Sequence, residues 1–141
     1  MNTQTITLAS ILASIIWADG DYSEVERETI GEVADALGVD EKELNMNLTA
    51  ALVEMKNLDE KAATEYAVKH CSKVDPEETG EIFQAVMQLA LCDSVLTAGE
   101  VHNILTLAEA LDIDRESAVL MLCDLVKTEP ELEVSFEDEE L

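Results

Sequence analysis

The sequence predicts an all-α fold, a compact bundle of about seven helices. Apolar residues recur at helical spacing along the 141 residues, as in the run that contains Leu8, Ile11, Leu12 and Ile15. Two prolines and five glycines leave long uninterrupted segments, and no alternating strand pattern with hairpin turns occurs. Because 48% of the residues are hydrophobic, one domain of this length can bury its own core.

The first helix is predicted from about Leu8 to Asp19, where the apolar pattern stops. Gly20 suits the left-handed position that follows many helices. Ser23 then has the character of an N-cap, and Glu26 stands three residues later. This spacing predicts a capping box, in which each side chain bonds the backbone amide of the other, at the start of the second helix.

Gly38 is predicted to end the second helix, and Asp40 to open a third. A connector helix over residues 58–73 follows. Asp75-Pro76 predicts the start of the fifth helix, as an N-cap followed by proline at the first helical position.

The fifth helix is expected to end near Asp93. Thr97 and Glu100 predict a second capping box at the start of the sixth helix, and Asp114 is the expected cap of the seventh. Residues 129–141 are then read as an acidic tail.

The sequence also matches itself without a gap when Asp19 is placed on Asp93, since Ser23 then meets Thr97 and Glu26 meets Glu100. We therefore predict a domain over residues 1–128 made of two pseudo-repeated three-helix units joined by the connector helix. Such units can bury their apolar faces against each other about a pseudo-twofold axis. The predicted units span residues 8–55 and 82–129.

The charge is strongly negative, with 32 Asp and Glu against 8 Lys and Arg and a net charge of −24. This balance argues against binding a nucleic-acid backbone, and an anionic membrane surface would repel the chain. Cations and basic protein surfaces fit it better.

The sequence favours a cytoplasmic protein that does not insert into a membrane. The apolar run Leu8–Ala18 is too short to span a bilayer, and no Lys or Arg precedes Arg27, so the basic start of a signal peptide is missing. The three cysteines form no CxxC motif, which argues against a disulfide framework. Their apolar helical neighbours predict that Cys71, Cys92 and Cys123 are buried.

The candidate site lies in the two acidic loops that the self-match aligns. If the pseudo-twofold axis passes near them, the carboxylates of both halves meet and require a cation or protons to relieve their repulsion. Oxygen ligands favour calcium, magnesium or manganese. The other interpretation is that the two glutamates serve as helix caps without a metal. The candidate metal ligands are Asp19, Glu26, Asp93 and Glu100.

The two segments "ADGDYSEVERETIGEVADALGV" and "CDSVLTAGEVHNILTLAEALDI" resemble the paired motifs of the TerB-like family. That family includes the tellurite-resistance TerB proteins and the N-terminal domain of a membrane-anchored DnaJ-like co-chaperone. The resemblance implies an all-helical fold of two pseudo-repeats, acidic loops that hold a divalent cation, and a role in stress-resistance systems that assemble near the membrane. The second copy departs from the motif, with Ser94 in place of its glycine.

These observations predict a non-enzymatic adaptor or sensor in a stress-response assembly of the tellurite-resistance type, with a protein partner that is membrane-associated. A metal-free acidic interaction module and a metal-dependent hydrolase are the alternatives. His70 and Cys71 are adjacent on a predicted helix, so their side chains point to different faces and do not form a catalytic dyad.

Overall fold

A computed structural model describes residues 2–19, 22–92, 95–128 and 133–135, with only the backbone described at 18–19, 95–96, 128 and 133–135. Within these ranges the chain forms seven helices, which confirms the all-α fold class, and two strands of three residues each. The helices are α1 (Thr5–Asp19), α2 (Glu24–Leu37), α3 (Glu41–Met55), α4 (Glu60–Cys71), α5 (Thr79–Ala90), α6 (Ala98–Ala110) and α7 (Arg115–Thr128). The strands are β1 (Val95–Thr97) and β2 (Glu133–Ser135).

Most helix ends follow the local signals in the sequence. Gly38 ends α2 in the left-handed conformation with φ of 71°, and its backbone amide bonds to carbonyls of the last turn. Asp40 caps α3 through the amide of Lys42, and Asp59 caps α4 through the amide of Ala62. The predicted C-terminal role of Gly20 lies outside the described residues.

The predicted start of the fifth helix at Asp75-Pro76 is wrong, because α5 begins only at Thr79. Residues 75–78 form a turn in which Asp75 Oδ1 accepts the amide of Glu77 at 2.9 Å. The side chain of Glu78 accepts the amides of Asn2 and Thr3, each at 2.7 Å. This contact with a distant segment holds the turn outside the helix, and a local capping signal cannot anticipate it.

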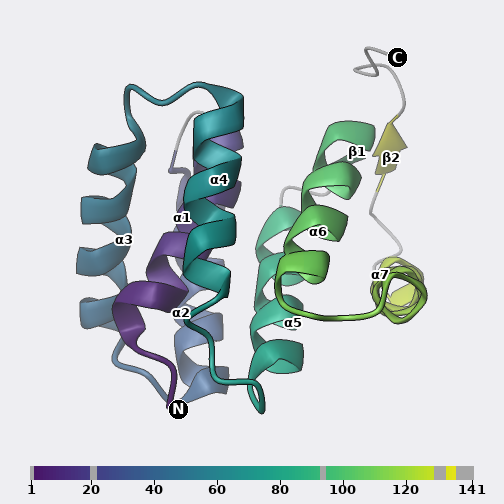
Figure 1. The fold of residues 1–141 in the computed structure, drawn as a ribbon, viewed down its shortest axis with the longest axis horizontal. Coiled ribbons are helices and arrows are strands. Elements are labelled where there is room, and N and C mark those ends of the chain that lie inside the picture. The colour runs from purple at the N-terminus through teal and green to yellow at the C-terminus, as the bar shows by residue number, and fades with distance from the viewer. Residues whose placement is uncertain (1, 20–21, 93–94, 129–132, 136–141) are drawn as a thin grey trace.

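Helix α1 lies at the centre of the first half of the molecule. It packs against α3, α4 and α5, and Figure 1 shows its upper part passing behind α4. Its apolar residues face all directions rather than one stripe, which is the pattern of a buried helix. The residues of α1 that are at most 1% exposed are Leu8, Ala9, Ile11, Leu12, Ala13 and Ile16.

Helix α5 carries the core into the second half, since it packs against α1, α2 and α6. Its Phe83 is fully buried and is among the largest core side chains. Helices α1 to α6 run alternately up and down in Figure 1, whereas α7 is seen end-on beside α6. Because α3 lies along α1 while α7 packs chiefly on α6, the two predicted three-helix units differ in their packing, and the pseudo-repeat stays a prediction.

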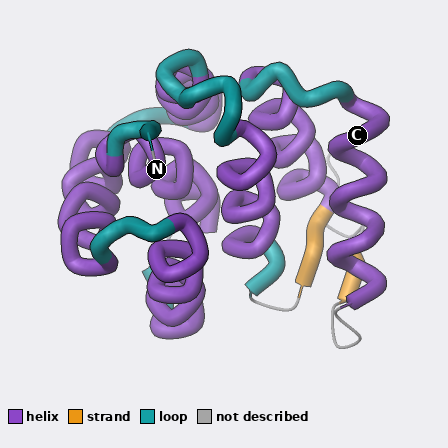
Figure 2. Tube along the Cα trace, turned by 90° about the horizontal axis from the view of Figure 1, so that it is seen from below, coloured by secondary structure: helices purple, strands orange, loops and turns teal. Residues whose placement is uncertain are grey.

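The two short strands are a feature that the sequence analysis did not predict. β1 pairs with β2 in parallel, with Leu96 opposite Val134. Figure 2 shows the two strands side by side near the last helices. The pairing ties a segment of the tail back to the residues that lead into α6.

None of the described helices has the length and apolar character needed to cross a bilayer.

Candidate functional site

The first acidic loop leads into a capping box at the start of α2. The amide of Ser23 donates to Glu26 Oε1 at 2.8 Å, and the amide of Glu26 donates to Ser23 Oγ at 3.2 Å. The Glu26 side chain is only 2% exposed. The predicted capping box is therefore confirmed here, and it places a carboxylate in the protein interior, where polar bonds must replace its hydration.

Tyr22 fixes the position of this loop against the neighbouring helices. Its hydroxyl donates to Asn45 Oδ1 on α3 at 2.6 Å, and the Arg27 guanidinium lies 4.4 Å from the centre of its ring. Burial raises the pKa of Tyr22, and the nearby Arg27 charge partly opposes that shift. The loop is thus attached to both α2 and α3.

The second acidic loop forms the same structure at the start of α6. The amide of Glu100 donates to Thr97 Oγ1 at 3.1 Å, and the amide of Thr97 donates to Glu100 Oε1 at 3.2 Å. The Thr97 hydroxyl also donates to Glu100 Oε1 at 3.0 Å. Both capping boxes lie at the same end of the bundle, where α2 and α6 begin (Figure 1).

The structure describes the surroundings of only two of the four candidate metal ligands. Glu26 and Glu100 act in the capping boxes. Asp19 is the last residue of α1, but its side chain lies outside the described residues, as does the whole of Asp93. Among the side chains that are described, no group of three or more His, Cys, Asp or Glu is placed to hold a metal ion. The four-carboxylate site therefore remains a prediction.

The surroundings of His70 and Cys71 fit side chains that pack in the structure rather than react. The His70 ring lies against Tyr66, with ring centres 4.8 Å apart. Burial, followed by the charges of Lys73 and Lys69, lowers the pKa of His70. Burial also raises the pKa of the Cys71 thiol to about 12. A thiol of that pKa stays protonated at neutral pH and is a poor nucleophile.

The expectation that all three cysteines are buried is wrong for Cys123. Cys71 is buried and Cys92 is half-buried, but Cys123 is exposed on α7. Its neighbour one turn earlier, Leu120, is 67% exposed, so this face of α7 points away from the core. The apolar residues around Cys123 in the sequence belong partly to this exposed face.

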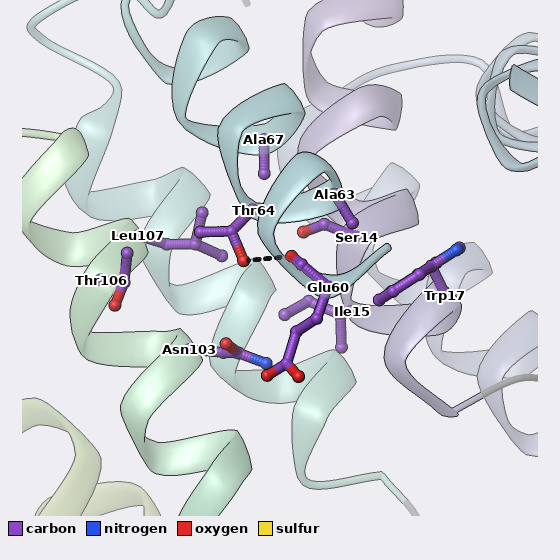
Figure 3. A pocket seen from close by; sticks show the side chains of 10 residues that line it. All are labelled: Ser14, Ile15, Trp17, Glu60, Ala63, Thr64, Ala67, Asn103, Thr106 and Leu107. Carbon is purple, nitrogen blue, oxygen red and sulfur yellow. Dashed lines mark hydrogen bonds between the residues drawn. The ribbon is translucent and has the colours of Figure 1, made fainter. Parts of the chain in front are cut away.

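A pocket that the sequence analysis missed lies between α1, α4 and α6 (Figure 3). Its volume is about 260 Å³. Three helices that are far apart in the sequence form it, so only their packing reveals it. Its lining combines small apolar, hydroxyl, amide and carboxylate groups with an indole ring: Ser14, Ile15, Trp17, Glu60, Ala63, Thr64, Ala67, Asn103, Thr106 and Leu107.

The hydroxyl groups of the pocket all donate their protons to the helices that carry them. Ser14 Oγ donates to the carbonyl of Ile11 at 2.7 Å. Thr64 Oγ1 donates to the carbonyl of Glu60 at 3.0 Å, the bond drawn in Figure 3. Thr106 Oγ1 donates to the carbonyl of His102 at 2.9 Å. Each hydroxyl therefore keeps lone pairs, but no proton, for a molecule in the pocket.

The Trp17 indole is held in the same way. Its Nε1–H donates to the carbonyl of Met55 at 2.9 Å, which anchors α1 to the end of α3. The ring itself lines the pocket beside Glu60 in Figure 3. The pocket thus has one aromatic wall whose polar atom is already bonded elsewhere.

Comparison with protein families matches residues 5–121 to the family described as tellurite resistance protein TerB. The match extends from the start of α1 into α7 and includes both capping boxes. No curated protein and no solved structure matches the chain.

Proposed function

Since the chain belongs to the TerB family of tellurite resistance proteins, we propose that it is a non-enzymatic adaptor or sensor in a cytoplasmic stress-response assembly. It joins this assembly by presenting acidic surface to a basic region of a membrane-associated protein partner.

One acidic surface on α2 carries this proposal. Four carboxylates recur there at helical spacing, and all four residues are exposed. Like charges one turn apart destabilise a helix by about 0.2–0.5 kcal/mol for each pair, so this arrangement costs folding stability unless a positive partner neutralises it. We call Glu24, Glu28, Glu32 and Asp35 the α2 acidic stripe.

Calorimetric titration with hexalysine tests the adaptor proposal. We expect binding at low salt that weakens as sodium chloride is added, because exposed ion pairs are screened within about one Debye length. Replacing the stripe by three glutamines and one asparagine is expected to weaken binding about tenfold, as the combined loss of several exposed ion pairs.

The matched control neutralises four exposed glutamates on other helices and loops: Glu65, Glu77, Glu109 and Glu116. This variant has the same net charge as the stripe variant. Equal losses of affinity in the two variants would show that only the total charge of the protein matters, and would contradict a role for α2. Failure of hexalysine to bind the native protein at low salt would overturn the adaptor proposal as stated.

We further propose that a divalent cation, calcium, magnesium or manganese, binds between the two acidic loops. Support comes from the two matching capping boxes, each of which holds a glutamate carboxylate where its helix begins, and from the buried position of Glu26. The carboxylates of Asp19 and Asp93 complete the proposed ligand set. An ion that binds only the folded protein adds about 2.7 kcal/mol at a hundredfold excess over its dissociation constant.

Thermal melting with each ion, before and after chelation, tests the cation proposal. The melting temperature is expected to rise with the ion and to return on chelation, and the double variant D19N/D93N should lose this response. D40N is the control, because Asp40 is also an aspartate next to a helix but caps α3 instead. If none of the three ions changes the melting temperature of the native protein, the cation proposal is contradicted.

The two alternatives give different results in the same experiments. A metal-free interaction module binds hexalysine with the same affinity after chelation. A metal-dependent hydrolase, which requires an open coordination position, shows turnover of a phosphate ester that chelation abolishes. The adaptor shows no such turnover.

A further inference from the structure

We propose that the pocket between α1, α4 and α6 binds a lysine side chain of the partner. This inference rests on the proposed function, because it names a second contact for the same basic partner. It concerns a surface separate from the α2 acidic stripe, since no residue of α2 lines the pocket.

The hydrogen-bonding groups of the pocket select for a donor. The hydroxyls of Ser14, Thr64 and Thr106 give their protons to helix carbonyls, so they can only accept from a ligand. Glu60 adds a carboxylate, which also only accepts when ionised. Among the described residues of this lining, only the Asn103 amide has N–H groups that are not already bonded within the protein. A ligand that carries several N–H donors and a positive charge is therefore complementary to the walls.

The state of the Trp17 indole agrees with a ligand that donates hydrogen bonds. Trp17 lines the pocket while its N–H is bonded to the carbonyl of Met55, so the indole offers a ligand no hydrogen-bond donor. In the view of Figure 3, the Glu60 carboxylate points toward Asn103, and the Trp17 ring lies apart from it.

The size and arrangement of the pocket favour a side chain, and lysine in particular. Its volume of about 260 Å³ is below the range of about 300–1,000 Å³ that is usual for sites of small molecules. Ala63 and Ala67 leave apolar wall for the methylene stem of a lysine. Besides the Glu60 carboxylate, the acceptors are single hydroxyl oxygens on three different helices. They therefore suit the rotatable donors of an ammonium better than the planar fork of arginine.

Trp17 makes the pocket directly observable, because it is the only tryptophan in the chain. Titration with hexalysine is expected to change its fluorescence in a saturable way, whereas hexaglutamate at the same ionic strength leaves it unchanged. E60Q is expected to raise the dissociation constant from this signal about threefold, as for the loss of one exposed ion pair. T106V, which keeps the shape but removes an acceptor, is expected to raise it about twofold.

E65Q is the matched control, because Glu65 is an exposed glutamate of the same helix that does not line the pocket. It removes the same charge and should leave the tryptophan signal and its midpoint unchanged. Thermal melts of all three variants confirm that they fold. A changed midpoint of the hexalysine titration therefore reports a change in binding.

Three results would overturn the lysine assignment: no tryptophan response to hexalysine, equal effects of E60Q and E65Q, or tighter binding of hexa-arginine than of hexalysine. Calorimetry separates this failure from failure of the adaptor proposal. If calorimetry still shows salt-sensitive hexalysine binding that depends on the α2 acidic stripe, only the pocket assignment fails. If calorimetry shows no binding at all, the adaptor proposal fails with it.

Discussion

The two capping boxes show how single residues determine where a helix starts. Ser23 with Glu26, and Thr97 with Glu100, satisfy backbone amides that have no partner inside their own helices. Because all the groups involved lie within four residues, the sequence alone could predict these bonds. It could not show that Glu26 would be almost completely buried, since burial depends on the helices packed around it.

We predict that S23A and T97A each lower the free energy of unfolding by about 1 kcal/mol, the usual loss when a capping side chain is removed. Urea unfolding followed by circular dichroism measures this difference. T49A on the exposed face of α3 is the control, because Thr49 has no capping role and alanine favours a helix. A loss in T49A as large as in S23A would contradict the role of the caps.

Glu78 joins the N-terminal residues to the turn before α5. Besides the two amides, the Thr3 hydroxyl donates to Glu78 Oε1 at 2.5 Å. This hydroxyl bond, followed by the amides of Asn2 and Thr3, lowers the pKa of Glu78 below its ordinary value of 4.5. The ionised form is therefore favoured in the folded protein relative to the unfolded chain.

This shift predicts how the variant E78Q depends on pH. A carboxyl whose pKa is lowered by folding contributes stability above its ordinary pKa and loses that contribution as the pH falls through the lowered value. E78Q should therefore be less stable than the native protein at neutral pH, and the difference should shrink below about pH 4.5. Urea unfolding across this pH range measures the difference in the free energy of unfolding between E78Q and the native protein. E77Q is the control, since Glu77 is exposed in the same turn, and a difference that is constant with pH would refute the linkage.

At the scale of elements, helices were predictable where their limits depend on nearby residues. Gly38 and Asp40 were sufficient to locate the boundary between α2 and α3. The start of α5 and the pairing of β1 with β2 were not, because both depend on contacts between residues distant in sequence. The pocket was missed for the same reason. Of the predicted metal ligands, the sequence placed Glu26 and Glu100 correctly in capping boxes, and the meeting of all four carboxylates stays a prediction.

The strand pair predicts a local effect of removing the tail. Deleting residues 129–141 removes β2, the hydrogen-bonding partner of β1. We expect faster amide hydrogen exchange at Val95–Thr97 and in the first turn of α6, whereas α1 and α3 keep their protection because the strands pack chiefly on each other and on α6. Exchange measured by mass spectrometry tests this. Unchanged amide exchange at β1, or an equal acceleration of exchange in α1, would contradict a local stabilising effect of the strand pair.

At the scale of the whole molecule, apolar burial must overcome the repulsion among the acidic groups. The buried cluster extends from Leu8 in α1 to Leu122 in α7, so all seven described helices contribute to one core or pack against it. The net charge of −24 opposes this compact state, because folding brings like charges closer together.

We therefore predict that the melting temperature rises by several degrees when sodium chloride increases from about 0.01 M to about 1 M, as the Debye length falls from about 30 Å to about 3 Å. Differential scanning calorimetry measures the shift. Calcium chloride at matched ionic strength separates screening from specific binding, since only a bound ion gives an additional rise that a chelator removes. A melting temperature that is flat or falls with sodium chloride would show that charge repulsion does not limit stability.

The central position of α1 has a consequence for how the protein is made. Among the helices, α1 leaves the ribosome first, yet its apolar faces are covered by α3, α4 and α5, the last of which ends at Ala90. At about 5–20 residues per second, the newly made helix waits on the order of ten seconds for those neighbours. Throughout this interval its apolar side chains lack the neighbours that cover them in the folded protein.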